Sequence, residues 1–418
     1  MRWRTFVVPV VLAFAAGGWA LAERLEDTLY VPLDHPAIQY AKQGTDPVAL
    51  FDKKLAAGTA KLEYSAGGTG YLASVLKQLG IDVDSQVLVF SRGSIQTTRI
   101  SPRTPRAIYF NDDVQVGFVQ NGDVLELTSL DPVRGIYLYG MDAEKSDKPR
   151  FGRRDDCLRC HQGPQTMGIP GLMISSVHPS DGAREGHGGA FMTDGSTPIG
   201  ERWGGWYVTG STGAQAHLGN NTNLVDPLHP GPSMPDAPRN ISSLGQFLDT
   251  SRYLAPTSDL IALMTLEHQT RMTNLLIRIG WDARIALHDN KWDAAVMDSE
   301  IDDLVTYMVF ADEAPLKAPV SGVSMFAKTF AARGPKDKKG RSLREFDLQT
   351  RLFKYPLSYM IYSAAFEALP DRAKSEIYQK LNDVLSGKDS RAKFAKLGAE
   401  ERTAALEILR ETKAGAPR

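Results

Sequence analysis

The chain has 418 residues, 42% of them hydrophobic, and its 48 lysines and arginines nearly balance its 49 aspartates and glutamates, for a net charge of −1. This balance argues against a nucleic-acid partner. The length is sufficient for a sizeable core, which we expect to be arranged as two subdomains.

Residues 1–22 have the pattern of a secretory signal peptide. Two arginines precede an uncharged run over residues 5–22, which ends in the small-x-small cleavage site Ala20-Leu21-Ala22. The run approaches the length that spans a bilayer, so an uncleaved membrane anchor is the alternative. In either case the rest of the chain is expected to be exported, with membrane contact only if this segment stays attached.

Residues 23–145 contain most of the strand signals. Short apolar runs at 86–91 and 107–111 indicate strands, and residues 114–130 read as two strands around Asn121-Gly122, a strong hairpin turn signal. The spacing of apolar residues over 70–81 predicts an amphipathic helix. This part is therefore expected to form a small antiparallel β-rich α+β unit.

Both cysteines of the chain lie in the segment RRDDCLRCHQG, residues 153–163, three positions apart and followed at once by a histidine. A redox dithiol, a zinc half-site, a disulfide and covalent haem attachment all use such a pair. Structural zinc needs four ligands, and no second cysteine pair exists. A thioredoxin-like pair should follow a buried strand, whereas the residues before Cys157 read as a charged loop.

Haem attachment accounts for every residue type of the motif. Cys157 and Cys160 on one helical turn could bond the two vinyl groups of one porphyrin, and His161 would then be the proximal iron ligand. Asp155 and Asp156 suit the start of that turn, because carboxylates are favoured at a helix N-terminus.

Through this short motif the sequence resembles the c-type cytochromes. The resemblance implies one covalently attached haem c and, for a bacterial protein, a periplasmic location. The segments RWGGWYVTG (202–210) and LEHQ (266–269) also resemble large uncharacterised bacterial proteins that contain a cytochrome c domain, a resemblance that implies no activity.

Residues 146–255 are dense in glycine and proline and lack regular periodicity, which predicts a functional loop region around the haem. Its aromatic residues could line a macrocycle or seal an ordinary core; they are Trp203, Trp206 and Tyr207. Four nearby arginines could pair with haem propionates or be solvated; they are Arg153, Arg154, Arg159 and Arg202.

Residues 256–418 read as a helical region, so the whole chain is predicted to be α+β. Helix-spaced apolar residues occur at 258–280, 300–314, 343–369 with a break near Pro356, 371–385 and 399–413. The basic stretch 332–344 is either a solvated turn or a docking patch for an acidic redox partner protein.

The sixth iron ligand decides between electron transfer and chemistry at the iron. His268 is the first candidate, because it lies in an apolar i+4 stripe where an unpaired imidazole would be costly; the alternative is a core histidine with a hydrogen-bond partner. Met234 is the runner-up, since its proline-flanked loop resembles the methionine loop of small c-type cytochromes. Further candidates are Met167, Met173, His178, His187 and His217.

These observations predict an exported monohaem c-type cytochrome that acts in electron transfer. The alternative is a haem enzyme acting on peroxide, oxygen or a small organic substrate, with residues 201–220 forming the pocket. A haem-bearing sensor or scaffold subunit is a third class, for which the sequence offers no signalling segment.

Overall fold

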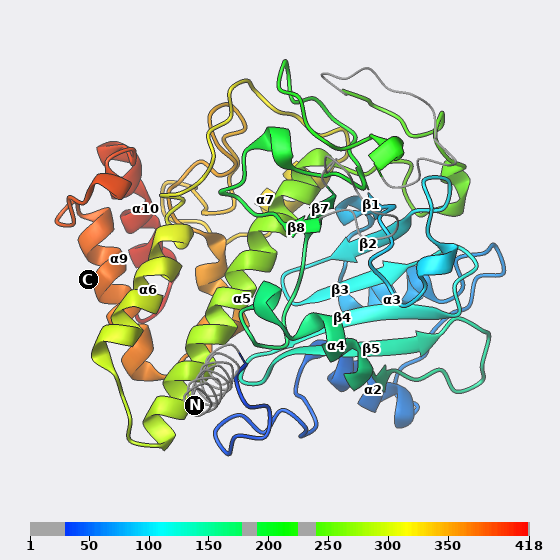
Figure 1. The fold of residues 1–418 in the computed structure, drawn as a ribbon, viewed down its shortest axis with the longest axis horizontal. Helices are drawn as coiled ribbons and strands as arrows, with labels where there is room; N and C mark the ends of the chain where they lie inside the picture. Colours follow the sequence, from blue (N-terminus) through cyan, green and yellow to red (C-terminus); the bar gives the residue numbers. More distant parts are fainter. Residues whose placement is uncertain (1–29, 178–189, 225–239, 417–418) are drawn as a thin grey trace, which may run out of the picture.

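The computed structural model describes residues 30–177, 190–224 and 240–416, and it has an α+β fold (Figure 1). The strands are β1 Val87–Val89, β2 Arg106–Phe110, β3 Val114–Phe118, β4 Val124–Asp131, β5 Gly135–Asp142, β6 Gly152–Arg153, β7 Ser175–Val177, β8 Ala190–Met192 and β9 Trp206–Tyr207. The helices are α2 Pro47–Ala56, α3 Leu72–Leu79, α4 Leu158–His161, α5 Leu260–His288, α6 Ala294–Met308, α7 Phe326–Ala332, α8 Ala364–Glu367, α9 Asp371–Leu385 and α10 Ala399–Thr412.

A seven-stranded antiparallel sheet has the order β6-β5-β4-β3-β2-β1-β9. The predicted hairpin over 114–130 is confirmed as β3 and β4, with Asn121 in the left-handed region at φ 53°. Both edge strands, β6 and β9, come from the glycine-rich region 146–255. The sheet therefore extends across the predicted boundary between residues 145 and 146.

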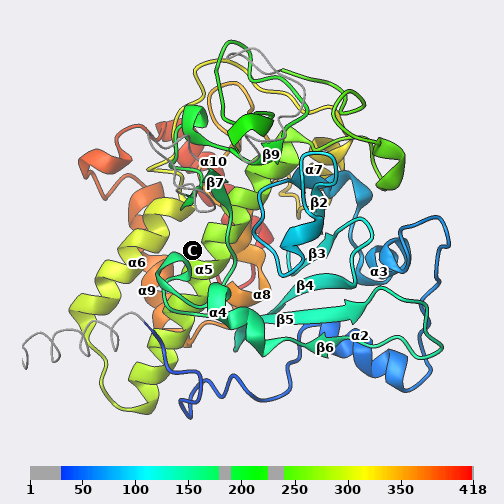
Figure 2. The same cartoon turned by 45° about the vertical axis from the view of Figure 1, so that its right-hand side comes forward.

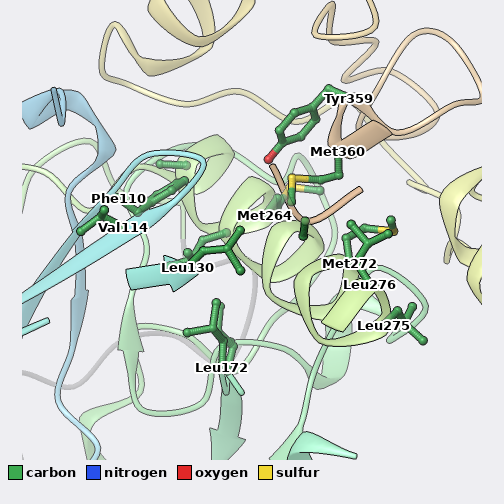
Figure 3. Packing of buried hydrophobic residues seen from close by; sticks show 14 of the residues in the cluster. Phe110, Val114, Leu130, Leu172, Met264, Met272, Leu275, Leu276, Tyr359 and Met360 are labelled. Carbon is green, nitrogen blue, oxygen red and sulfur yellow. The ribbon is translucent and has the colours of Figure 1, made fainter. Parts of the chain in front are cut away.

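Helices α2 and α3 contact the sheet at β4 and β3, while α5 separates the sheet from α6, α9 and α10 (Figures 1 and 2). Figure 3 shows the core at this junction, with Phe110 and Leu130 on the side of the sheet and Met264 and Leu276 on the side of α5. Because α5 is buried on the side of the sheet and on the side of the C-terminal helices, it carries apolar residues around most of its surface.

Most of the predicted elements are confirmed. The strands expected at 86–91 and 107–111 are β1 and β2, and the helix expected at 70–81 is α3, ended by Gly80 at φ 65°. The helices expected at 258–280, 371–385 and 399–413 are α5, α9 and α10, with α5 extending to His288. The helix expected at 300–314 is α6, which begins earlier, at Ala294, and ends at Met308.

The helix expected at 343–369 is wrong for most of its length. Within these residues only a 3₁₀ turn, Tyr359–Tyr362, and α8 are helical. Asp347 accepts hydrogen bonds from the backbone N–H groups of Thr350 and Arg351, and Leu348 has φ 60°, so a tight turn replaces the helix. The apolar residues of this segment pack into an aromatic cluster instead, where Phe346 stacks on Phe353.

The basic stretch 332–344 is held against α10. Lys339 and Arg341 form ion pairs with Glu407 at 2.8 and 2.6 Å, and Arg341 also pairs with Asp337. Part of its positive charge is thus matched within the chain. The predicted signal peptide, residues 1–22, lies outside the described residues, and within the described ranges no helix combines the length and apolar character needed to cross a bilayer.

Candidate functional site

The two cysteines and the histidine of the motif lie on one short helical segment, residues 155–161, which we call the attachment turn (Figure 2). A 3₁₀ turn, Asp155–Cys157, runs directly into α4, so the turn begins at the predicted residue. Its two aspartates do not cap it. They pair with the arginines two positions earlier, Arg153 with Asp155 at 2.6 Å and Arg154 with Asp156 at 2.8 Å, where the chain leaves β6.

Cys157 is half-buried and Cys160 is exposed, and neither is in a disulfide. Burial raises the pKa of Cys157, so its thiol is the protonated form at neutral pH. Positions three residues apart lie on the same face of a helical turn. The motif therefore presents two thiols on one face of a helical turn, and no disulfide joins them in the structure.

The imidazole of His161 is oriented by a hydrogen bond to the loop that follows it in the chain. Its Nδ1 lies 2.9 Å from the carbonyl oxygen of Gly171, and since a carbonyl only accepts, Nδ1 carries the hydrogen and donates. Burial lowers the pKa of His161, which keeps the imidazole neutral. In the part of the chain that the structure describes, no hydrogen bond involves Nε2, so its lone pair is available to an iron ion.

Residues 162–172, the attachment loop, are fixed by α5. Asn274 accepts a hydrogen bond from the N–H of Leu172 at 2.9 Å and donates to its carbonyl at 2.8 Å. Arg278 donates to the carbonyl of Met167 at 2.7 Å. A Cβ on Gly171 would lie 2.7 Å from Oδ1 of Asn274, so only glycine allows this approach. The carbonyl that orients His161 is thus held by a helix about a hundred residues later in the chain.

Two charged residues of the sheet act electrostatically on His161. The charge of Arg106 on β2 lowers the pKa of His161, and that of Glu126 on β4 raises it. These two residues form a partly buried ion pair at 2.9 Å. Ser94 and Gln96 also donate to the Glu126 carboxylate, at 2.6 and 3.0 Å, while Nε of Arg106 is buried and lacks a hydrogen-bond partner.

A row of glycines crosses the sheet beside this ion pair. Gly117 of β3 and Gly140 of β5 are the register partners of Glu126, and Gly152 of β6 pairs with Gly140. A Cβ on Gly140 would lie 3.4 Å from the side chain of Arg154, so the residues just before the attachment turn lie against this row. Sequence reasoning did not identify these residues, although single glycines inside strands are a known sign of close backbone or ligand approach.

His268 lies in separate surroundings from His161. Its Nε2 is 2.7 Å from the hydroxyl of Ser358, and its ring is packed among aromatic side chains of the C-terminal region, Tyr307, Phe310, Phe353 and Tyr359. The cavity that it borders has a volume of about 10 Å³, room for one water molecule and not for a macrocycle. This environment matches the alternative considered from the sequence, a core histidine bonded to a side chain.

The other predicted site residues divide into four groups. Met234, His178 and His187 lie outside the described residues. The three aromatic residues Trp203, Trp206 and Tyr207 are buried and hydrogen-bonded to Glu267, Ser175 and Pro102, so they seal a core. Arg202 is buried in an ion pair with Glu267 at 3.3 Å, Arg153 lies over the rings of Tyr40 and Tyr137, and Arg159 is exposed. Met167 and Met173 are half-buried, and His217 packs against Trp203.

Comparison with known protein families, with curated proteins and with solved structures finds no match to this chain.

Proposed function

We propose that the chain is a monohaem c-type cytochrome, with one haem c attached through Cys157 and Cys160 and His161 as the proximal ligand. The observation that carries this proposal is the hydrogen bond from Nδ1 of His161 to Gly171, which leaves Nε2 open on the same turn as two free thiols. Metal-bound histidines commonly donate their other N–H to a backbone carbonyl in this way. The haem would supply one-electron redox chemistry when bound.

The residues present fit that group. Each thiol can add across one vinyl group, its sulfur bonding one carbon and its hydrogen going to the other, so attachment needs no oxidant. Nδ1–H donation to Gly171 makes Nε2 of His161 a more basic ligand. The exposed Arg159 of the attachment turn is a suitable donor for a propionate carboxylate.

Electron transfer outside the cytoplasm is the function that we favour. The signal sequence predicted at residues 1–22 leads to export and, in a bacterium, to the periplasm, where a redox partner protein would exchange electrons with the haem. The exposed Cys160 puts one edge of the attachment turn at the molecular surface, which suits electron exchange with such a partner.

One observation favours a haem enzyme as the second candidate. His268, the first candidate for a sixth ligand, forms a hydrogen bond with Ser358 inside an aromatic cluster, so it is not available to coordinate the iron. An open sixth position would permit binding of peroxide, oxygen or another small molecule.

Expression in a host that matures c-type cytochromes tests the proposal. We expect the colour to stay with the polypeptide in acid acetone and the mass to exceed that of the apoprotein by one haem. Cys157→Ala and Cys160→Ala should each leave one thioether bond, and the double variant should lose the haem on extraction. A colourless wild-type protein would refute haem attachment.

The optical and electron-paramagnetic-resonance spectra of the oxidised protein then separate the two functions. A low-spin spectrum that cyanide does not alter would support electron transfer. A high-spin spectrum with ready cyanide binding would support the enzyme.

A further inference from the structure

Two histidines and an aspartate from distant parts of the sequence meet at the end of α5. Nε2 of His35 lies 3.4 Å from the Asp289 carboxylate, and Nδ1 of His288 lies 2.8 Å from the same oxygen. One ligand atom from each of the three residues lies within 4.8 Å of the other two. The side chains are 16% exposed for His35, 48% for His288 and 31% for Asp289, so the group is open to solvent on one side.

We propose that His35, His288 and Asp289 form a binding site for one divalent transition-metal ion, with zinc as the best-suited ion. Two imidazoles and one carboxylate are a ligand set that zinc accepts, and three protein ligands leave a fourth tetrahedral position for water. The atoms are spaced so that one ion could replace the hydrogen bond between His288 and Asp289 and the 3.4 Å contact between His35 and Asp289. This site is separate from the proposed haem site and does not depend on it.

The electrostatics at the end of α5 favour a cation. His288 is the last residue of this 29-residue helix and Asp289 is its C-cap, where the helix dipole is negative. The carboxylate of Asp289 already accepts a hydrogen bond from Nδ1 of His288 at 2.8 Å, so it faces a positively polarised group. Lys291 also acts on Asp289 and opposes a cation, but its side chain is exposed and solvent screens it.

Two hydrogen bonds must be given up for the metal to bind: the one between His288 and Asp289, which the ion replaces, and the one from Ala37 to His35. Nδ1 of His35 accepts from the N–H of Ala37 at 3.2 Å, so Nε2 carries the hydrogen in the metal-free ring. A metal ion on Nε2 would move that hydrogen to Nδ1, and the Ala37 amide would then need another partner. Since this bond is long and only partly buried, its loss is a small cost beside metal coordination.

The ion would join the N-terminal segment 30–40 to α5 next to the attachment loop. Val31 donates to the carbonyl of Gly168 at 3.1 Å, and Gln162 donates to the carbonyl of Val31 at 3.4 Å. The segment that carries His35 is therefore also bonded to the loop that follows His161. A metal ion at His35 would stabilise this arrangement from the side of α5.

Titration calorimetry of the full-length protein with Zn²⁺, after removal of bound metals by a chelator, tests the site. We expect one equivalent to bind to the wild type and to raise its melting temperature. His35→Gln and His288→Gln should each weaken this binding at least tenfold. Asp34→Asn, an exposed neighbour outside the ligand group, is the matched control and should bind as the wild type does.

Cobalt(II) provides a second measurement. Its visible absorption should show four-coordinate geometry in the wild type and in Asp34→Asn but not in His35→Gln. If the histidine variants bind Zn²⁺ with wild-type affinity, the ion sits elsewhere and the proposal is wrong; an absence of binding to the wild type also overturns it. Neither result bears on the haem, which is measured by its own spectrum.

Discussion

Asn274→Ala is expected both to destabilise the protein and to disturb His161, the proposed proximal ligand. Asn274 is only 4% exposed, and its amide satisfies both backbone groups of Leu172, which is 5% exposed. Alanine removes the two hydrogen bonds and leaves a buried N–H and a buried carbonyl without partners.

The expected loss follows from these two groups. A buried polar group left unsatisfied costs about 1–3 kcal/mol, and a water molecule can occupy part of the space that the amide vacates. We therefore expect the free energy of unfolding to fall by about 2–4 kcal/mol. Gln165→Ala is the matched control, since it removes an exposed amide from the same loop, and it should change this free energy by less than about 0.5 kcal/mol.

Denaturant unfolding of the haem-loaded protein, followed by far-ultraviolet circular dichroism, gives the stability. The second readout is the absorption spectrum of the native protein. Gly171, which accepts from His161, precedes Leu172 directly, so a displaced loop should alter the axial field of the iron. An Asn274→Ala variant as stable as Gln165→Ala, with an unchanged spectrum, would contradict the view that α5 positions the proximal histidine.

Three further results are expected. Burial lowers the pKa of His268 from its ordinary 6.5 to about 3, so between these pH values the unfolded chain binds one more proton than the folded chain. The free energy of unfolding should therefore fall by up to about 1.4 kcal/mol per pH unit on acidification through this window. Denaturation at several pH values should show that His268→Gln removes this contribution to the slope. Arg202→Met leaves the Glu267 carboxylate buried without its cation and should lower the free energy of unfolding by about 3–5 kcal/mol. The double variant Arg202→Met with Glu267→Gln should recover part of this loss, and equal stability of the single and the double variant would contradict the argument. His161→Ala should retain the haem through both thioether bonds while its absorption spectrum changes, and an unchanged spectrum would exclude His161 as a ligand.

Features that depend on neighbouring residues in the chain could be predicted from the sequence. The hairpin of β3 and β4 follows from an Asn-Gly turn between two apolar runs, and α9 coincides with its apolar periodicity. The attachment turn is equally local, because Cys157, Cys160 and His161 lie within one helical turn whatever surrounds them. The local pattern was wrong over residues 343–369, where the Asp347 carboxylate accepts a backbone hydrogen bond that stabilises a turn in place of the expected helix.

The environment of each site residue was decided by the tertiary structure. An i+4 stripe predicted that His268 is buried, but it could not reveal that Ser358 and four aromatic rings from later in the chain would enclose it. The hydrogen bond of His161 to Gly171 depends on Asn274, and the meeting of His35 with Asp289 depends on where α5 ends. Such partners are selected by packing between segments far apart in sequence. Periodicity specifies which face of an element is buried and carries no information about what lies opposite that face.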